Sequence, residues 1–261
     1  MCGYRMNGHG LPLRLQRACQ RRMAKSLGRR LFNLLPGRPL VSFTFDDFPR
    51  SALVTGGSIL ERFGLAGTYY ASLGLVGKTT PSGEVFHPED LKPLLDRGHE
   101  LGCHTFDHCP AWDTAPAAFE ASIVRNAEAL RRLVPDAEFL TLSYPINNPR
   151  PETKRRSASH FACCRGGGQI FNMGRVDLNY LAAFFLEQKR DDPAAIKQVI
   201  DANGRAGGWL IFATHDVCPS PTPFGCSPEL FENIVNHSIK SGAQILPVYR
   251  AWQVIQSRSE K

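Results

Sequence analysis

Short apolar runs alternate with segments of helical periodicity along the chain after residue 38. Seven runs have the length and apolar content of strands: residues 40–45, 67–71, 99–103, 138–143, 160–164, 209–214 and 243–248. Between them, apolar residues recur at three- and four-residue steps over residues 51–63, 88–97, 116–133, 193–204 and 228–240. This alternation predicts parallel βα units that form either a barrel or an open sheet.

The N-terminal segment has a different pattern. Apolar residues recur at helical spacing between Leu11 and Leu34, with arginines on another face, which predicts a basic amphipathic helix. We therefore divide the chain into a basic extension, residues 1–38, which is either this helix or disordered, and a catalytic domain, residues 39–261. The extension is interpreted as a segment that lies on an anionic membrane, a transit-type segment or a solvated tail.

Charge and composition narrow the class of protein. Residues 1–38 hold nine Arg and Lys and no acid. Since the net charge of the whole chain is +7, the net charge of the remaining residues is −2, and no nucleic-acid partner is expected. No run approaches the ~20 apolar residues of a membrane-spanning helix. Eight cysteines form no C-x2-C pair, and the N-terminus lacks the apolar run of a secretory signal. Reduced thiols and a cytoplasmic location are expected, and the oligomeric state is left open.

Two adjacent carboxylates follow the first predicted strand, at Asp46 and Asp47. Two buried acids side by side are costly unless a cation is present. A divalent metal would neutralise one of them and leave the other free to accept a proton. Reactive residues of parallel α/β folds collect at the C-terminal ends of strands, which is where this pair lies.

Histidines follow two further strands. His104 and His108 come after residues 99–103 at a spacing that lets two imidazoles face one metal. With Asp47 they make a set of two nitrogens and one carboxylate, which favours zinc and leaves a position for water. His215 follows residues 209–214 and is the candidate general acid. The histidines at 87, 99, 160 and 237 lack such neighbours and are expected to have structural or surface roles.

At these residues the sequence resembles the polysaccharide deacetylases, also called the nodulation-deacetylase homology domain or carbohydrate esterase family 4. The first motif of the family, T-F-D-D-G, matches Thr44 to Asp47, with Phe48 where Gly is usual. The second, H-[ST]-x-x-H, is matched in full by His104, Thr105 and His108.

The other motifs are more divergent. Tyr144-Pro145-Ile146-Asn147 is similar to the Y-P-Y-G form of the third motif, and Ala213-Thr214-His215 to the fifth, L-x-H. For the fourth, D-x-x-D-W, Arg175-Val176-Asp177 is the nearest candidate. The resemblance covers about residues 39–250.

The resemblance implies an α/β fold, a distorted (β/α) barrel of about seven parallel strands, with one divalent metal, zinc being favoured. It also implies removal of N-acetyl groups from amino-sugar oligo- or polysaccharides. Asp46 and His215 would be the catalytic base and acid. Tyr144, Pro145 and Ile146 would line the oxyanion and substrate site, and Thr105 and Asp216 would support it.

One departure from the family raises a physical problem. Ser143 stands where many members carry an Arg that pairs with the catalytic Asp. Because Asp46 lies beside Asp47, each carboxylate raises the pKa of the other unless a cation compensates. We expect Arg175 to enter the cleft and pair with Asp46, with Arg150 as the competing candidate.

Other functions fit the same residues. The site also suits a deformylase or another small-amide hydrolase, and the missing Arg suits a pseudoenzyme that binds metal or glycan without turnover. In a fourth hypothesis the basic extension carries the main function of the protein, as an adaptor that binds nucleic acid or membrane.

Overall fold

The computed structural model describes residues 11–146, 148–187 and 192–259. A curled sheet of parallel strands forms its centre in the order β10-β11-β2-β3-β6-β7-β8, and β12 also pairs with β2. Their bounds are β2 Leu40–Phe45, β3 Thr68–Ala71, β6 Glu100–Cys103, β7 Thr141–Ser143, β8 Cys163–Arg165, β10 Phe184–Phe185, β11 Trp209–Thr214 and β12 Gln244–Ile245. Hydrogen bonds between β8 and Leu181, just before β10, bring the two edges together. The predicted distorted (β/α) barrel is confirmed.

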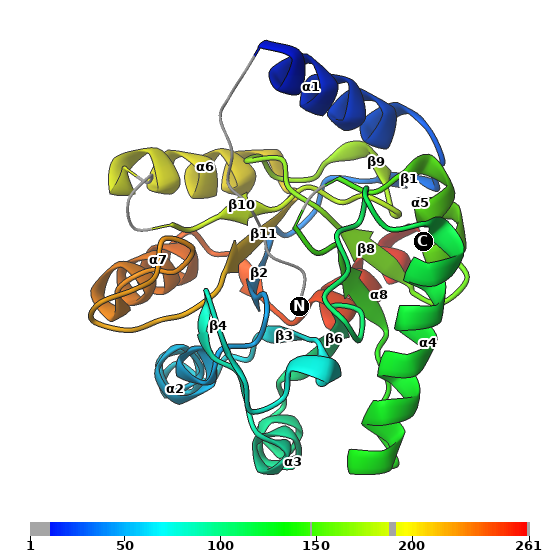
Figure 1. Cartoon of the computed structure of the whole chain (residues 1–261). Helices are drawn as coiled ribbons and strands as arrows, with labels where there is room; N and C mark the ends of the chain where they lie inside the picture. The colour runs from blue at the N-terminus through cyan, green and yellow to red at the C-terminus, as the bar shows by residue number, and fades with distance from the viewer. Residues whose placement is uncertain (1–10, 147, 188–191, 260–261) are drawn as a thin grey trace.

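Helices surround this sheet (Figure 1). The outer ones include α2 Ser58–Arg62, α3 Pro88–Asp96, α4 Pro116–Leu133, α5 Pro151–Ser157, α6 Pro193–Ala206 and α7 Pro228–Lys240. Five of these begin with proline, whose fixed φ and missing N–H suit the first helical position. None of the helices among the described residues has the length and apolar character to cross a membrane.

The remaining elements are short or peripheral. A π-helix, η1 Ala52–Gly57, precedes α2, and a 3-10 turn, η2 Leu73–Leu75, follows β3. The hairpin β4 Thr79–Thr80 and β5 Gly83–Glu84 projects from the next loop. Strand β1 Leu31–Leu34 pairs antiparallel with β9 Gly174–Asp177. The C-terminal helix α8 Val248–Ser259 donates its first N–H groups to Thr68 and Glu100 at the N-terminal ends of β3 and β6.

Alternate strand positions fill two different environments. Phe43, Phe45 and Tyr69 point toward the helices and pack with residues such as Phe231 of α7. The intervening positions face the barrel interior and are polar over much of the sheet, as Thr141 illustrates. The interior therefore contains hydrogen-bonded groups below the strand ends that carry the candidate site.

Glu100 is the acidic member of this interior. Its carboxylate accepts hydrogen bonds from Thr141 Oγ1 at 2.7 Å, Thr68 Oγ1 at 3.3 Å and the N–H of Tyr249 at 2.8 Å. Burial raises the pKa of Glu100 from 4.5 to about 7. The unfolded chain ionises this carboxyl at lower pH than the folded protein, so its contribution to stability falls as pH rises between these two values.

We therefore expect Glu100→Gln to stabilise the fold at pH 8 by up to about 3 kcal/mol and to have little effect below pH 4.5. Urea unfolding at both pH values measures the difference. Glu128→Gln, on the exposed side of α4, is the matched control and should change neither value. A Glu100→Gln variant that is equally destabilised at both pH values would contradict this account.

The N-terminal helix α1 Leu11–Ser26 ends earlier than the apolar spacing predicts. Gly28 has a φ of +61°, and a Cβ there would lie 2.4 Å from the carbonyl oxygen of Pro151. The chain turns at this residue and continues as β1, so the predicted helix does not extend to Leu34. A left-handed glycine is a frequent helix terminator, and the close approach to α5 requires it here.

Buried polar contacts attach the second half of this segment to the barrel. Lys154 of α5 donates to the carbonyl oxygens of Ala24 at 2.6 Å and Leu27 at 2.8 Å, and pairs with Asp177 at 2.6 Å. The guanidinium of Arg30 donates to backbone carbonyls at Ala158, Phe161 and Ala162. The division at residue 38 stays a prediction, but residues 24–34 contact the predicted catalytic domain.

Lys154→Met should lower the free energy of unfolding by about 3 kcal/mol or more, because it leaves the buried Asp177 without its cation. Denaturant unfolding of the full chain measures this loss. Lys92→Met is the control, since Lys92 forms an exposed pair with Asp96 and should cost less than about 1 kcal/mol. Equal losses in the two variants would show that the buried attachment of α1 contributes nothing.

Candidate metal centre and active site

The candidate residues converge at one end of the barrel. Asp46 and Asp47 follow β2, His104 follows β6 and His215 follows β11. Strands β11, β2, β3 and β6 are consecutive neighbours in the sheet, so their C-terminal ends meet along one rim. The structure brings all of these predicted residues together.

Asp47, His104 and His108 form the metal-binding candidate. Asp47 Oδ1 lies 3.3 Å from His104 Nε2 and 2.9 Å from His108 Nε2, and one ligand atom from each residue lies within 4.8 Å of the others. Ligands on a tetrahedral zinc at ~2.0–2.1 Å are separated by about 3.3 Å. Among the described residues this is the one group of three or more His, Cys, Asp or Glu side chains with such geometry.

The protonation of the group suits a cation. Asp47 Oδ1 is buried and accepts no well-aligned hydrogen bond, although two imidazoles lie beside it. A metal ion bound by this oxygen and the two imidazole nitrogens would satisfy all three ligand atoms. Burial acts to raise the pKa of Asp47, but His104 and His108 hold that pKa well below its ordinary range. Asp47 in turn raises the pKa of His108 against the effect of burial. Metal binding should therefore release a proton from His108 and weaken at acid pH.

Two neighbours orient these ligands. The carbonyl oxygen of Ser143 lies 2.8 Å from His104 Nδ1, which places the proton on that nitrogen and leaves Nε2 free to coordinate. Ser82 Oγ, in the turn between β4 and β5, donates to Asp47 Oδ2 at 2.6 Å. Sequence reasoning missed Ser82, because its hairpin carries no motif and reaches the site only through the fold.

Backbone strain concentrates at the site. Six described non-glycine residues have positive φ, and five of them are site residues or their neighbours: Asp47, Phe48, Thr105, His108 and Ile146. This conformation is costly for β-branched residues such as Thr105 and Ile146, and such strain clusters at functional sites.

Packing and hydrogen bonds hold two of these strained residues. Phe48, where the family motif has Gly, has a φ of 45°, and its buried ring stacks on Phe86 at 4.4 Å. Thr105 Oγ1 accepts the N–H of Cys109 at 2.9 Å, which fixes the turn between the two histidine ligands. Thr105 thus acts on the turn and does not point to the metal ligands.

Asp46 pairs with Arg165, so the expectation that Arg175 supplies the cation is wrong. Arg165 ends β8, is almost fully buried, and its Nη2 donates to Asp46 Oδ1. In the sheet, Arg165 is the register partner of Ser143, so the guanidinium enters from the strand next to the usual motif position. Burial acts to raise the pKa of Asp46, but Arg165, His104 and His215 lower it below its ordinary value.

The two arginines proposed from the sequence lie elsewhere. Arg175 is exposed on β9, opposite Asn33 of β1, because its strand belongs to the small outer sheet. Arg150 donates from Nε to the carbonyl oxygen of Trp112 and holds that loop. Arg165 directly follows the predicted strand of residues 160–164, so the strand-end rule that found the other residues would also have found it.

His215 lies near the second carboxylate oxygen of Asp47, whereas His104 and His108 lie near the first. Its Nε2 lies 4.0 Å from Asp47 Oδ2, and its Nδ1 lies 3.2 Å from the carbonyl oxygen of Phe224. Asp216 is buried and accepts from the N–H of Thr222 at 2.8 Å and from the Thr222 hydroxyl. Asp216 therefore supports the loop that carries Phe224, and through it the orientation of His215.

The Tyr144-Pro145-Ile146 segment follows β7 and is partly committed to packing and to a backbone hydrogen bond. The N–H of Tyr144 is bonded to the carbonyl oxygen of Arg165 at 3.1 Å, and Pro145 has no N–H. The Tyr144 ring is buried against Phe119. Ile146 is 47% exposed at the end of this segment, at the same rim. Asn147, the last residue of the motif, lies outside the described residues.

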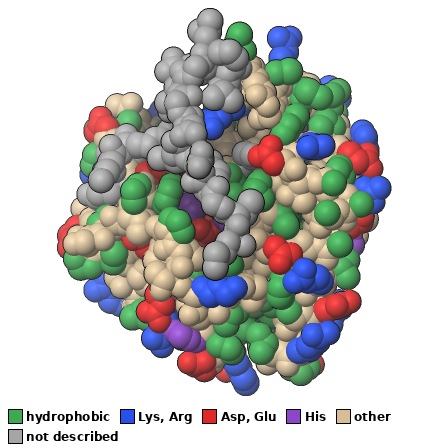
Figure 2. Space-filling model, in the orientation of Figure 1, with side chains coloured by type: hydrophobic (Ala, Val, Ile, Leu, Met, Phe, Trp, Pro, Cys, Tyr) green, Lys and Arg blue, Asp and Glu red, His purple; other side chains and the backbone are tan. Residues whose placement is uncertain are grey.

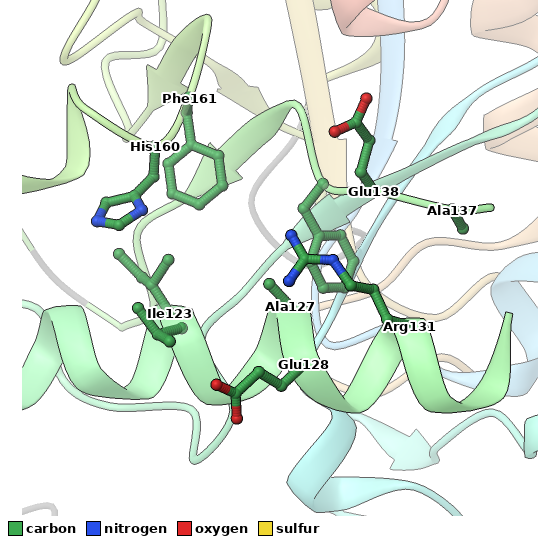
Figure 3. A pocket seen from close by; sticks show the side chains of 10 residues that line it. Ile123, Ala127, Glu128, Arg131, Ala137, Glu138, His160 and Phe161 are labelled. Carbon is green, nitrogen blue, oxygen red and sulfur yellow. The ribbon is translucent and has the colours of Figure 1, made fainter. Parts of the chain in front are cut away.

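A surface cavity of about 210 Å³ lies away from the strand ends, beside α4 (Figure 3). Apolar side chains such as Ile123 and Phe161 line it, with Glu128, Arg131 and His160 around them. It contains none of the predicted site residues, so the strand-end group remains the candidate active site.

Purified protein should bind one zinc-like divalent ion per chain, and the double variant His104→Ala, His108→Ala should lose it. Two of three ligands are removed, so the remaining carboxylate cannot hold zinc at a single site. Elemental analysis after dialysis measures the bound metal. Replacement of His87 and His160 by Ala is the control and should leave the content unchanged; full metal in the His104, His108 variant would place the ion elsewhere.

Comparison with known proteins first supports the class of fold. A family 4 acetyl xylan esterase from Clostridium thermocellum, solved with a cobalt ion, is 18% identical with a TM-score of 0.57 over 82% of this chain and 91% of its own. The Bc1960 peptidoglycan N-acetylglucosamine deacetylase is 16% identical with a TM-score of 0.58, covering 83% and 89%. A family 4 pseudoenzyme from Bacillus anthracis is 12% identical with a TM-score of 0.56, covering 84% and 66%. The chain thus has the fold of the family 4 carbohydrate esterases.

The sequence also matches a family model over part of its length. Residues 35–160 match the model of the polysaccharide deacetylases, and these residues include the acid pair and both metal-candidate histidines. No curated protein matches the chain in sequence. Over residues 35–160, slightly less than half of the chain, the resemblance to the polysaccharide deacetylase family is confirmed.

Proposed function

We propose that this protein removes N-acetyl groups from amino-sugar oligo- or polysaccharides, using one divalent metal. The observation that supports the proposal is that the two adjacent carboxylates have different partners. Asp47 faces two imidazoles, whereas Asp46 faces Arg165 and is kept ionised without being a member of the ligand group. The proposed hydrolysis uses both of these carboxylates, one to hold the metal and one as the base.

A bound metal would lower the pKa of a water molecule toward about 7 and polarise the acetamide carbonyl. Asp46 would accept the proton of the attacking water. The N–H of Ile146 would donate to the oxyanion that develops on the carbonyl oxygen. His215 Nε2 would donate a proton to the nitrogen as the C–N bond breaks, which gives acetate and a free amino sugar.

The rim of the site suits a sugar. Phe224 is 41% exposed and its ring centre lies 5.5 Å from that of His215, so an apolar ring face stands beside the proposed acid. Aromatic side chains of this kind combine an apolar contact surface with a defined geometry. Arg165 and Asp46 lie deeper, where only the reacting group would reach.

Two alternatives use the same residues. A deformylase or small-amide hydrolase would need the same base, acid and metal. A pseudoenzyme is the second alternative, because family 4 includes the Bacillus anthracis pseudoenzyme of similar fold and, in a mutant form, one with restored enzymatic activity. The Arg165–Asp46 pair argues against loss of turnover, since it supplies the cation that the third motif lacks.

The test is a substrate screen with metal-loaded protein and an Asp46→Asn control. Chitin oligomers, peptidoglycan fragments, N-formyl sugars and small cyclic amides would be assayed for released acid and free amine. Acetate from an N-acetylated glycan supports the proposal. Formate alone would favour the deformylase. No hydrolysis of any substrate by protein with a full complement of metal would favour the pseudoenzyme.

A further inference from the structure

Helix α1 directs an apolar stripe away from the barrel. Within the helix, Ala24 is buried against the domain, whereas Leu15 is 67% and Met23 37% exposed. Cys19 is also exposed and lies between them at four-residue spacing, so the three side chains share the face opposite Ala24. An amphipathic helix of a globular protein ordinarily turns its apolar stripe inward, whereas Leu15, Cys19 and Met23 of α1 are exposed.

The apolar surface continues past the helix. Leu27 is 48% exposed, Leu31 of β1 is 40% exposed and Leu35 is 44% exposed. Five of the fourteen exposed large hydrophobic residues in the described part of the chain therefore fall within residues 15–35. Such clustering marks an interaction surface, whereas single exposed residues do not.

The charge of this segment has one sign. Arg17, Arg21, Arg22 and Lys25 are exposed on α1, and residues 11–45 contain no acid. Figure 2 shows basic and hydrophobic side chains beside one another at the upper edge of the molecule, where α1 lies in Figure 1. A partner of this surface must be both anionic and apolar.

The helix cannot rotate to bury the stripe. Lys154 is buried and holds the carbonyl oxygens of Ala24 and Leu27, at the C-terminal end of α1. Gly28 is pressed against the Pro151 carbonyl, which fixes the turn that follows. The domain thus presents the outward face of α1 in a defined orientation.

We propose that α1 docks on the surface of an anionic lipid bilayer, with Leu15, Cys19 and Met23 entering the headgroup boundary. The basic side chains then lie at the level of the lipid phosphates. A second copy of the chain is a poor partner, because two all-basic helices would repel one another. Nucleic acid would pair with the arginines but leave the apolar stripe exposed. The proposal does not depend on the activity of the barrel.

Sedimentation of the full chain with sucrose-loaded vesicles tests the proposal. Binding is expected with vesicles that contain roughly 30% phosphatidylglycerol and not with phosphatidylcholine alone. Two variants separate the two contributions: Leu15→Ser with Met23→Ser, and Arg21→Gln with Arg22→Gln and Lys25→Gln. Each should raise the lipid concentration for half binding at least tenfold. Two matched control variants lie on the exposed end of α4. They are Leu133→Ser alone, and Arg131→Gln together with Arg132→Gln, and both should bind as wild type.

Alkylation gives a second measurement. Reaction of Cys19 with a water-soluble maleimide, followed by peptide mass spectrometry, should slow at least fivefold with anionic vesicles, while that of Cys218 stays unchanged. Failure to sediment with anionic vesicles would overturn the proposal. Equal losses of binding in the α4 controls would also overturn it. So would binding of duplex DNA that is unchanged by Leu15→Ser with Met23→Ser, or a wild-type dimer that dissociates in the α1 variants.

Discussion

Asp46→Asn should lower kcat on an N-acetylated oligosaccharide by at least about 10²-fold, the contribution typical of a general base. The amide of Asn has the same shape but cannot accept the proton of the attacking water. Asp46 is not a member of the ligand group, so bound metal should remain near the wild-type amount. Steady-state kinetics and elemental analysis on the same sample measure both quantities.

His215→Ala should produce a loss of the same order, also with metal retained, because His215 is not a member of the metal-ligand group. An activated ester substrate distinguishes the two roles. Its leaving group needs no proton, so it should restore much of the rate in His215→Ala and little in Asp46→Asn. A fully active Asp46→Asn protein would show that another group is the base.

Arg165→Met should lower kcat at pH 7 roughly tenfold to 10²-fold and move the acidic limb of the pH–rate profile to higher pH. Arg165 is the foremost of the charges that lower the pKa of Asp46 against the effect of burial. Without that cation, burial and Asp47 raise the pKa, and less of Asp46 is ionised at neutral pH. Activity should therefore recover in part as the pH is raised, which a merely misfolded site would not show.

The controls separate charge from packing. Arg165→Lys keeps the cation and should retain more activity than Arg165→Met, although the guanidinium also lies 4.7 Å from the Tyr70 ring and fills that space. Arg175→Met, on the exposed face of β9, should change kcat less than about twofold. Identical pH–rate profiles for wild type and Arg165→Met would end the assignment.

The sequence predicts the parts of this site that lie at the ends of long apolar runs. Strands β2 and β11 agree with their predicted bounds, and Asp46, Asp47 and His215 follow them directly. An apolar run reveals a buried parallel strand, and the residue after it must lie at the rim. The same relation at β8 indicates Arg165 as a residue of the rim, whereas the divergent fourth motif favoured Arg175.

Other parts depend on contacts between distant segments. Ser82, which donates to Asp47, lies in the turn of a hairpin whose two strands have only two residues each. The sequence of this hairpin resembles an ordinary loop. Strands β1 and β9 are short, and their pairing is fixed by residues far apart in the chain. Helical spacing of apolar residues also continued through Leu31 and Leu34, where Gly28 and the contact with α5 end the helix. Local periodicity cannot report a close approach to another element.

The attachment of α1 also bears on the order in which the chain is made. The groups that hold residues 24–30 are Lys154 and Asp177, separated from them by 130 and 147 residues. The ribosome therefore releases this segment well before its docking partners, which follow it by 130 residues or more. During that interval the apolar and basic residues of α1 have no fixed neighbour, and closing so long a loop is intrinsically slow. Residues of α1 are thus synthesised long before the groups that fasten them, and they stay available to a chaperone or a bilayer while translation continues.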